Sequence, residues 1–300
     1  MTATPSRPAD TPIRGVLMMC VAVVFFVIMN TLVKELRAQE LPLIEIVWGR
    51  YFFHFLLVLL LFPRRIPTLL AGSDKGWQIA RSVLVLLATA CMFTSVGLMP
   101  LADVVAITFI APLLITALSV PFLGERVGLR RWIAVFVGLA GMLVIVRPGS
   151  GLFQVAALLP ILVAVFAAAY QIITRLISHR TQPINSVFYT AILGAIVMSA
   201  IVPFFWQTPS PVQWLMLLGA GLMGGLGHWS IILAYQRAEA PLVAPFAYTE
   251  LIWATILGLT FFGDFPDLWT FVGAAIIAAS GIYILRRERV RRNARELGQV

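Results

Sequence analysis

Long apolar runs separated by short polar or charged segments recur along the whole chain. Each run spans about 18–25 residues, and about 20 helical residues cross the hydrocarbon core of a bilayer. The connecting segments are short, so we expect no soluble domain between the runs. The pattern predicts ten transmembrane helices, at residues 14–33, 43–62, 78–97, 101–123, 130–147, 152–174, 185–206, 212–236, 241–262 and 268–285.

One local pattern occurs twice. Residues 122–132 read FLGERVGLRRW and residues 261–269 read FFGDFPDLW, and a shift of 139 residues aligns them. The shift places Gly124 on Gly263 and also aligns Phe109 with Tyr248. The first copy carries three arginines, whereas the second carries two aspartates and no base. Internal repeats of this kind are a recurring design in transporters.

An odd number of spans in each repeat explains why the charge differs between the copies. A second half that follows five spans enters the membrane from the opposite side, so one copy of the loop faces the cytoplasm and the other the periplasm. The fold class that we predict is an all-α integral membrane protein with ten transmembrane helices arranged as two inverted five-helix repeats. Its predicted parts are a cytoplasmic tail at 1–13, repeats at 14–148 and 152–287, and a basic cytoplasmic tail at 288–300.

Composition agrees with a membrane protein. Of the 300 residues, 60% are hydrophobic and only 12% are charged, whereas a soluble domain carries about 25% charged residues. The formal charge of +9 does not indicate nucleic-acid binding, because the bases lie between apolar runs and in the terminal tail rather than on one basic surface.

The distribution of bases predicts the orientation. With a cytoplasmic N-terminus, eighteen lysines and arginines fall on the inner side and three on the outer side. Arg81 is counted here as an inner-side base, and Arg50 lies within a span. This bias predicts that both termini face the cytoplasm. The first dozen residues lack the basic start and cleavage site of a signal peptide. The two cysteines lie inside apolar runs and predict neither a disulfide framework nor a metal site.

Ionisable residues inside a span need a functional or structural reason, because each costs about 2.5–3.5 kcal/mol on insertion scales. Arg50 and His54 are four residues apart on one face of the second span, and Glu250 lies near the middle of the ninth. We expect Arg50 and Glu250 to approach each other or to share a water-filled cavity. An ion pair that only locks helix packing is the alternative.

Two further polar residues share a face of the first span, Asn30 and Lys34. Asn30 offers an amide to a polar ligand, and Lys34 is placed to extend its amine to water. Asp103 begins the fourth span, where a helix-capping role is expected.

Aromatic and polar residues of later spans complete a candidate cavity. The eighth span also holds the pair Gly221 and Gly225, which permits close backbone approach to a neighbouring helix. Prolines within the fourth, sixth and ninth spans are candidate hinges, namely Pro112, Pro160 and Pro245. The full set of predicted substrate-binding or translocation residues is Asn30, Arg50, His54, Tyr170, His228, Trp229, Tyr248, Glu250 and Trp253.

These segments resemble a known family. LADVVAITFIAPLLITALSVPFLGERVGLRRWIAVFVGLAGMLVIVRP is similar to the hallmark segment of EamA-type members of the drug/metabolite transporter superfamily. APLVAPFAYTELIWATILGLTFFGDFPDLWTFVGAAIIAASGIYILRRE resembles the C-terminal half of the same family. The second copy has Glu250-Leu251 where the first has Ala111-Pro112, which argues against a symmetric kink in the two spans.

The resemblance implies a secondary transporter of the bacterial inner membrane that works by alternating access. We expect export of amino acids, as in YddG-like exporters, with a small-molecule substrate and the lipid bilayer as partners and with no cofactor. Uptake of a cofactor-like metabolite such as S-adenosylmethionine or riboflavin is the alternative. Coupling to protons and the oligomeric state are left open by the sequence.

Other classes have weaker support. The chain contains no GxxxxGK[ST] phosphate-binding loop, which argues against an ATP-driven pump. An intramembrane hydrolase or a scaffold without transport is a remote alternative. The AASG at residues 278–281 lacks the first glycine of a GxSG motif, and no histidine follows Ser280 as a base. We therefore predict no catalytic residue.

Overall fold

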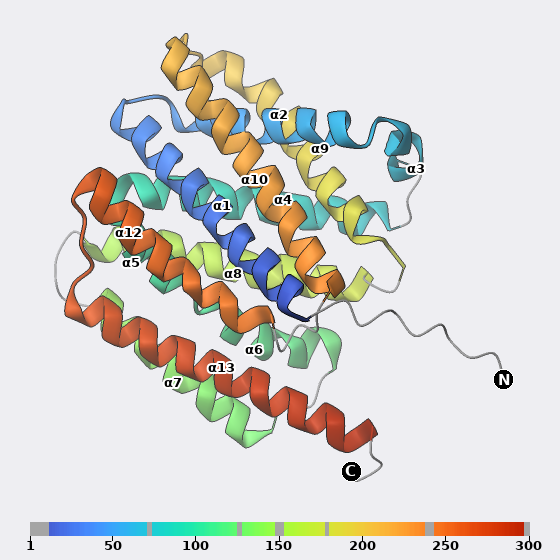
Figure 1. The fold of residues 1–300 in the computed structure, drawn as a ribbon, viewed down its shortest axis with the longest axis vertical. Coiled ribbons are helices and arrows are strands. Elements are labelled where there is room, and N and C mark those ends of the chain that lie inside the picture. The colour runs from blue at the N-terminus through green and yellow to red at the C-terminus, as the bar shows by residue number, and fades with distance from the viewer. Residues whose placement is uncertain are drawn as a thin grey trace.

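The described part of the chain is entirely helical. The computed structural model describes residues 12–70, 74–124, 128–147, 153–177, 180–237 and 243–296. Within these residues no strand occurs, and the helices pack into one elongated bundle (Figure 1). The start of α1 and the end of α13 lie toward the same end of this bundle (Figure 1).

The helices follow the order of the predicted spans. The first half of the chain holds α1 (Pro12–Ala38), α2 (Leu43–Leu61), the 3-10 helix η1 (Pro63–Arg65), α3 (Ile66–Leu70), α4 (Lys75–Leu98), α5 (Leu101–Thr108), α6 (Ala111–Leu123) and α7 (Leu129–Val146). The second half holds α8 (Phe153–Ile177), α9 (Pro183–Ile201), η2 (Val202–Phe205), α10 (Pro211–Arg237), η3 (Ala244–Thr249), α12 (Glu250–Phe262) and α13 (Leu268–Glu296).

Membrane-spanning segments account for most of the described chain. Seven segments are long and apolar enough to cross a bilayer by length and composition. Three shorter apolar helices lie at Trp132–Val146, Phe246–Phe262 and Leu268–Ile284. These positions correspond to the fifth, ninth and tenth predicted spans, so the helical membrane architecture expected from the hydrophobic pattern is confirmed.

The fourth and ninth spans are not single α-helices, contrary to the simple reading of their apolar runs. The fourth divides at Phe109 and Ile110 into α5 and α6, and Pro112 follows in the first turn of α6. A proline nitrogen cannot donate the helical hydrogen bond to Thr108, so the break follows from the sequence. The ninth begins as the 3-10 helix η3, which contains Pro245, before it becomes α12. Pro160, by contrast, lies inside an uninterrupted α8.

Helix boundaries repeat at the spacing found in the sequence. A shift of 139 residues takes α6 onto α12 at both ends, and takes the first residue of α7 onto the first residue of α13. Gly124 and Gly263 follow the two shorter helices with φ of 66° and 70°. Glycine adopts this left-handed conformation without the steric cost of a Cβ. Both spans are therefore interrupted, although Glu250 stands where the first copy has Ala111.

Helices from the two halves of the chain pack directly on each other. The largest interfaces join α1 to α10, α7 to α13, and α4 to α8. Glycines allow the closest approaches: a Cβ added at Gly221 of α10 would lie 2.4 Å from the Cβ of Phe53 and 3.1 Å from the carbonyl oxygen of Gly49. The close packing predicted for the small residues of the eighth span is thus observed against α2.

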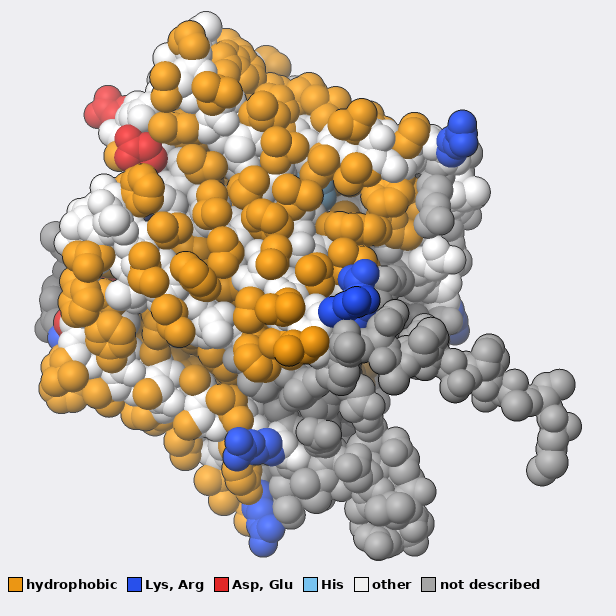
Figure 2. Space-filling view, viewed as in Figure 1, with side chains coloured by type: hydrophobic (Ala, Val, Ile, Leu, Met, Phe, Trp, Pro, Cys, Tyr) orange, Lys and Arg blue, Asp and Glu red, His pale blue; other side chains and the backbone are white. Residues whose placement is uncertain are grey.

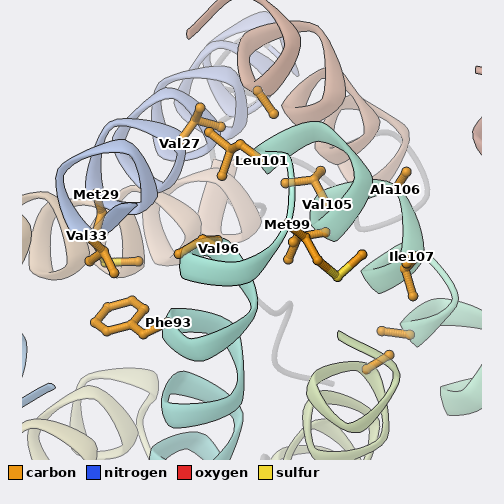
Figure 3. Packing of buried hydrophobic residues seen from close by; sticks show 14 of the residues in the cluster. Val27, Met29, Val33, Phe93, Val96, Met99, Leu101, Val105, Ala106 and Ile107 are labelled. Carbon is orange, nitrogen blue, oxygen red and sulfur yellow. The ribbon is translucent and has the colours of Figure 1, made fainter. Parts of the chain in front are cut away.

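The main hydrophobic core lies where α1 meets the α4–α5 corner. Val27 and Val33 of α1 face Phe93 and Val96 of α4, and Leu101 of α5 completes the contact (Figure 3). These side chains are at most 1% exposed. This core fixes α1, α4 and α5 relative to one another.

Apolar side chains also cover much of the outer surface. Figure 2 shows hydrophobic side chains spread over most of the described part of the visible face, with acidic groups at one end and most of the Lys and Arg groups at or toward the other. Phe136 and Ile196, at 63% exposed, belong to this surface. A broad apolar surface with charges restricted to its ends suits a bilayer environment.

Candidate functional site

Arg50 is the centre of a buried polar cluster between helices of both halves. It belongs to α2, and its side chain is 3% exposed. Its guanidinium lies 4.4 Å from the ring of Tyr51, and its Nη2 is 3.4 Å from Nε2 of His228 in α10. Its Nε and Nη1 are buried without a hydrogen-bond acceptor among the described residues. Gly224 of α10 lies next to this side chain, and a Cβ there would lie at ordinary contact distance, 3.6 Å, from Nε of Arg50.

His54 and His228 stack beside Arg50. Their ring centroids are 6.0 Å apart and the ring planes differ by 8°. Both nitrogens of His54 are buried and have no described partner. His228 also meets Phe26 of α1 edge to face, at 5.1 Å. The structure therefore brings together Arg50, His54 and His228, which the sequence analysis proposed separately on the second and eighth spans.

Arg81 is a member of this region that the sequence analysis assigned to the inner surface instead. It is 9% exposed, inside α4. Its Nε donates to Oγ1 of Thr174 at 2.7 Å, and its Nη1 donates to Oγ1 of Thr190 at 2.7 Å and to the carbonyl oxygen of Ser186 at 3.1 Å. The sequence of α4 alone could not predict this burial, because the acceptors that hold the Arg81 guanidinium belong to α8 and α9. The available sequence signal was an arginine at the fourth position of the predicted span 78–97, close to the polar residues Gln78 and Ser82.

Two tyrosines connect the arginines. The guanidinium of Arg81 lies 5.4 Å from the ring of Tyr170, and Tyr170 also interacts electrostatically with Arg50. Tyr51 contacts Arg50 through its ring and interacts electrostatically with Arg81. Its hydroxyl is 3.0 Å from Oγ1 of Thr89. Tyr170 therefore lies beside the buried arginines, and its role in substrate binding stays a prediction.

Glu250 does not pair with Arg50 in this structure. Within the described residues, no carboxylate lies within ion-pair distance of either Arg50 or Arg81. Glu250 begins α12, is partly buried, and has no side-chain partner among the described residues. The expected approach of Arg50 and Glu250 is therefore absent from the described residues, in which Nη2 of Arg50 instead lies 3.4 Å from Nε2 of His228.

The remaining predicted residues divide between interior and surface. Tyr248 is packed edge to face on Phe109 at 4.9 Å, and its hydroxyl is buried without a described partner. Trp229 packs on Phe62 at 5.0 Å and lines the same small cavity as His54. Trp253 lies on α12 and is 39% exposed, and its place in a cavity wall stays a prediction.

Asn30 of α1 is buried, and its side-chain oxygen has no donor among the described residues. An unsatisfied buried amide costs about 1–3 kcal/mol. This unsatisfied oxygen is consistent with the predicted contact between Asn30 and a polar ligand, which stays a prediction.

A second charged cluster lies at the connection between α12 and α13. Lys34 of α1 forms an ion pair with Asp264, donates to the carbonyl oxygen of Met99 at 3.1 Å, and lies 4.9 Å from the ring of Phe262. The expectation that the Lys34 amine extends to water is therefore wrong, because the amine pairs with the carboxylate of Asp264 in the α12–α13 connection.

Asp103 and Asp267 belong to the same cluster. Asp103 accepts a hydrogen bond from Oγ1 of Thr270 at 2.7 Å and makes no capping bond, which corrects its predicted role. Asp267 instead caps α13, accepting from the backbone N–H of Thr270 at 2.8 Å, and pairs with Arg147. Partial burial opposes ionisation of Asp267, but the Thr270 hydrogen bonds and the Arg147 charge outweigh it and hold the Asp267 pKa below its usual value.

Little open space adjoins the buried cluster. A cavity of about 10 Å³ lies beside His54 between α2, α9 and α10, which is room for one water at most. A larger cavity, of about 300 Å³, lies between α7 and α13 and is lined by Arg130, Ser280 and Tyr283 with four apolar residues. Neither of these two cavities is lined by Arg50.

Fold and site together define a class: a multi-span membrane protein with a buried polar centre between two groups of helices. Sequence comparison then gives the family. The chain belongs to the EamA-like transporter family, which matches residues 13–147 and again residues 154–286. The resemblance seen in the sequence is thereby confirmed.

Curated relatives are similar over nearly their whole length. A riboflavin transporter of Vibrio cholerae is 30% identical over 92% of this chain and 94% of its own. A pseudopaline exporter of Pseudomonas aeruginosa is 30% identical, over 92% and 97%. An S-adenosylmethionine uptake transporter of Rickettsia conorii is 27% identical, over 90% and 92%. Transport is the activity that these names share.

The fold has also been seen in a crystal structure. That structure covers 91% of this chain and 98% of its own, with a TM-score of 0.62 and 18% identity. At this identity the likeness concerns the fold alone.

Proposed function

We propose that the chain is a secondary transporter of small polar metabolites in the bacterial inner membrane, and that it exports amino acids or closely related compounds. The observation that carries this proposal is the buried cluster of Arg50, Arg81, His54 and His228 between helices of both halves. Polar groups at this depth are costly in a membrane and mark solute pathways. The named activities of the relatives support transport.

The proposed mechanism is alternating access by two inverted five-helix repeats, residues 14–148 and 152–287. The double family match and the helix boundaries repeated at 139 residues support this division. In this proposal the outer cluster is a gate: Lys34–Asp264 and Arg147–Asp267 join the halves and hold the outer end closed. The interrupted spans containing Pro112 and Pro245 act as hinges.

The proposed orientation has both termini in the cytoplasm. The excess of bases at one end supports it, and so does the position of the start of α1 and the end of α13 toward the same end (Figure 1). Proton coupling is proposed through Glu250, whose carboxyl group has no described partner within its span.

Uptake of a cofactor-like metabolite is the second candidate. It is favoured by the names of two relatives, a riboflavin transporter and an S-adenosylmethionine uptake transporter. The two candidates differ in substrate and direction but use the same buried centre.

Flux measurements in proteoliposomes decide between them. A panel of amino acids, riboflavin and S-adenosylmethionine is tested from each side, with and without a pH gradient. Amino-acid flux supports the first candidate, and flux of riboflavin or S-adenosylmethionine alone supports the second. A protein that moves none of these solutes would contradict both candidates.

A further inference from the structure

We infer that Arg50 and Arg81 together bind an anionic group of the transported solute, a carboxylate or a phosphate. This inference rests on the proposed transport function and adds the substrate chemistry. Two permanently charged guanidiniums lie in the interior of a membrane bundle, 3% and 9% exposed, and neither has an ion-pair partner among the described residues.

Most buried or paired acidic side chains of the described chain interact with groups other than Arg50 and Arg81. Asp264 and Asp267 pair with Lys34 and Arg147 at the outer end, and Asp74 pairs with Arg180 at 3.8 Å. Asp103 accepts from Thr270. Glu45 of α2 accepts from the backbone N–H of Gln207. Within the described residues, the two buried positive charges therefore have no carboxylate as an ion-pair partner.

Donors remain free at the cluster. Arg50 has two buried nitrogens without an acceptor, and both nitrogens of His54 are also unpartnered. The hydrogen bonds of Arg81 to Thr174, Thr190 and the Ser186 carbonyl use its Nε and Nη1. Guanidinium groups match carboxylate and phosphate oxygens in charge and geometry. A solute anion would satisfy both the charges and the unused donors.

The surroundings hold Arg81 in place for this role. Thr174, Thr190 and the Ser186 carbonyl fix its guanidinium without neutralising it, since all three acceptors are uncharged. Tyr51 and Tyr170 lie against the two arginines and form the aromatic part of the site. Because α2 and α4 come from the first half and α8, α9 and α10 from the second, an anion bound here would contact both halves.

Transport by the full-length protein in proteoliposomes tests the inference with pairs of amino acids and their carboxamides. Wild-type protein should move the carboxylate form at least tenfold faster than the amide. Arg50→Gln and Arg81→Gln should reduce flux of the acid at least tenfold and remove this preference. Arg64→Gln, which alters an exposed arginine at η1, is the matched control and should behave as wild type. Equal wild-type flux of acid and amide would overturn the inference.

Thermal unfolding of the purified protein provides a readout that does not need a known substrate. Acetate, succinate and inorganic phosphate are compared with chloride at equal ionic strength. Stabilisation by the oxyanions, weakened at least tenfold in apparent affinity by Arg50→Gln or Arg81→Gln, supports the inference even if the flux panel fails. The oxyanion that stabilises most distinguishes a carboxylate from a phosphate substrate. No oxyanion effect on wild-type protein would overturn it.

Folding of the variants is checked by gel filtration in detergent. If a glutamine variant is not monodisperse, Arg50→Lys and Arg81→Lys replace it. Each retains the positive charge but loses the planar donor geometry, so we expect oxyanion stabilisation to be reduced but still measurable. The double variant Arg50→Lys, Arg81→Lys provides the contradicting outcome. If it folds, shows no stabilisation by oxyanions and still transports at the wild-type rate, anion binding at this site is contradicted.

Discussion

At the residue scale, several buried side chains of the candidate site carry polar atoms that have no hydrogen-bond partner among the described residues. Arg50, His54 and Glu250 were identified from the sequence because ionisable groups are rare in apolar spans. Their contacts could not be predicted, since these depend on which face of α10 meets α2. Arg81 was missed because a count of bases treats an arginine near a predicted span end as a surface charge.

Substitution of Glu250 by glutamine tests its role in coupling. The side chain has no described ion pair or hydrogen bond, so we expect the free energy of unfolding to change by no more than about 0.5 kcal/mol. Flux should become indifferent to an imposed pH gradient, measured in proteoliposomes. Glu40→Gln, at an exposed position, is the control. A marked loss of thermal stability with the pH response retained would indicate a structural role instead.

Asp267 gives a prediction for acidic conditions. Its pKa is lowered in the folded protein, so its stabilising contribution is present above the unfolded-state value of about 3.9 and is lost as pH falls through the lower folded-state pKa. Between pH 5 and 8 we expect no titration of this group. Thermal melts from pH 6 to pH 3 should show a smaller acid-induced loss in Asp267→Asn than in wild type. An equal loss would show that the link to Thr270 and Arg147 is energetically negligible.

At the element scale, helix positions were predictable because about 20 apolar residues per span leave a clear hydrophobic pattern. Interruptions were harder to predict. Pro112 and Pro245 coincide with breaks, whereas α8 continues through Pro160, because neighbouring groups in a bundle can accommodate a proline. The departure at Glu250 suggested an asymmetric pair of spans, yet α6 and α12 have the same length and end at equivalent glycines.

Gly221 allows α10 to pack closely on α2. The variant Gly221→Ala tests this contact. The added methyl group would meet the Cβ of Phe53 at 2.4 Å, and neither backbone can shift independently. We expect destabilisation of about 1–3 kcal/mol, seen as a lower midpoint of unfolding in detergent. Gly76→Ala is the matched control, because nothing lies within 4 Å of its added methyl group. Equal stability of the two variants would contradict the proposed tight packing.

At the scale of the whole molecule, a buried cationic centre lies between helices of both halves, and two ion pairs, Lys34–Asp264 and Arg147–Asp267, join the halves at the α12–α13 connection. The sequence predicted the membrane class and the family from composition, apolar runs and the two related segments. It did not predict that FFGDFPDLW supplies Asp264 to Lys34 and Asp267 to Arg147. Those pairs join residues more than a hundred positions apart, and no local pattern specifies them.

A reversible cross-link at the outer end tests the central claim, which is alternating access to the buried centre. Lys34→Cys and Asp264→Cys are introduced together after Cys20 and Cys91 are replaced by serine, and flux is measured in the same proteoliposomes before oxidation, after oxidation and after reduction. Alternating access predicts that the disulfide abolishes flux and that reduction restores it. Undiminished flux through fully cross-linked protein would contradict the account.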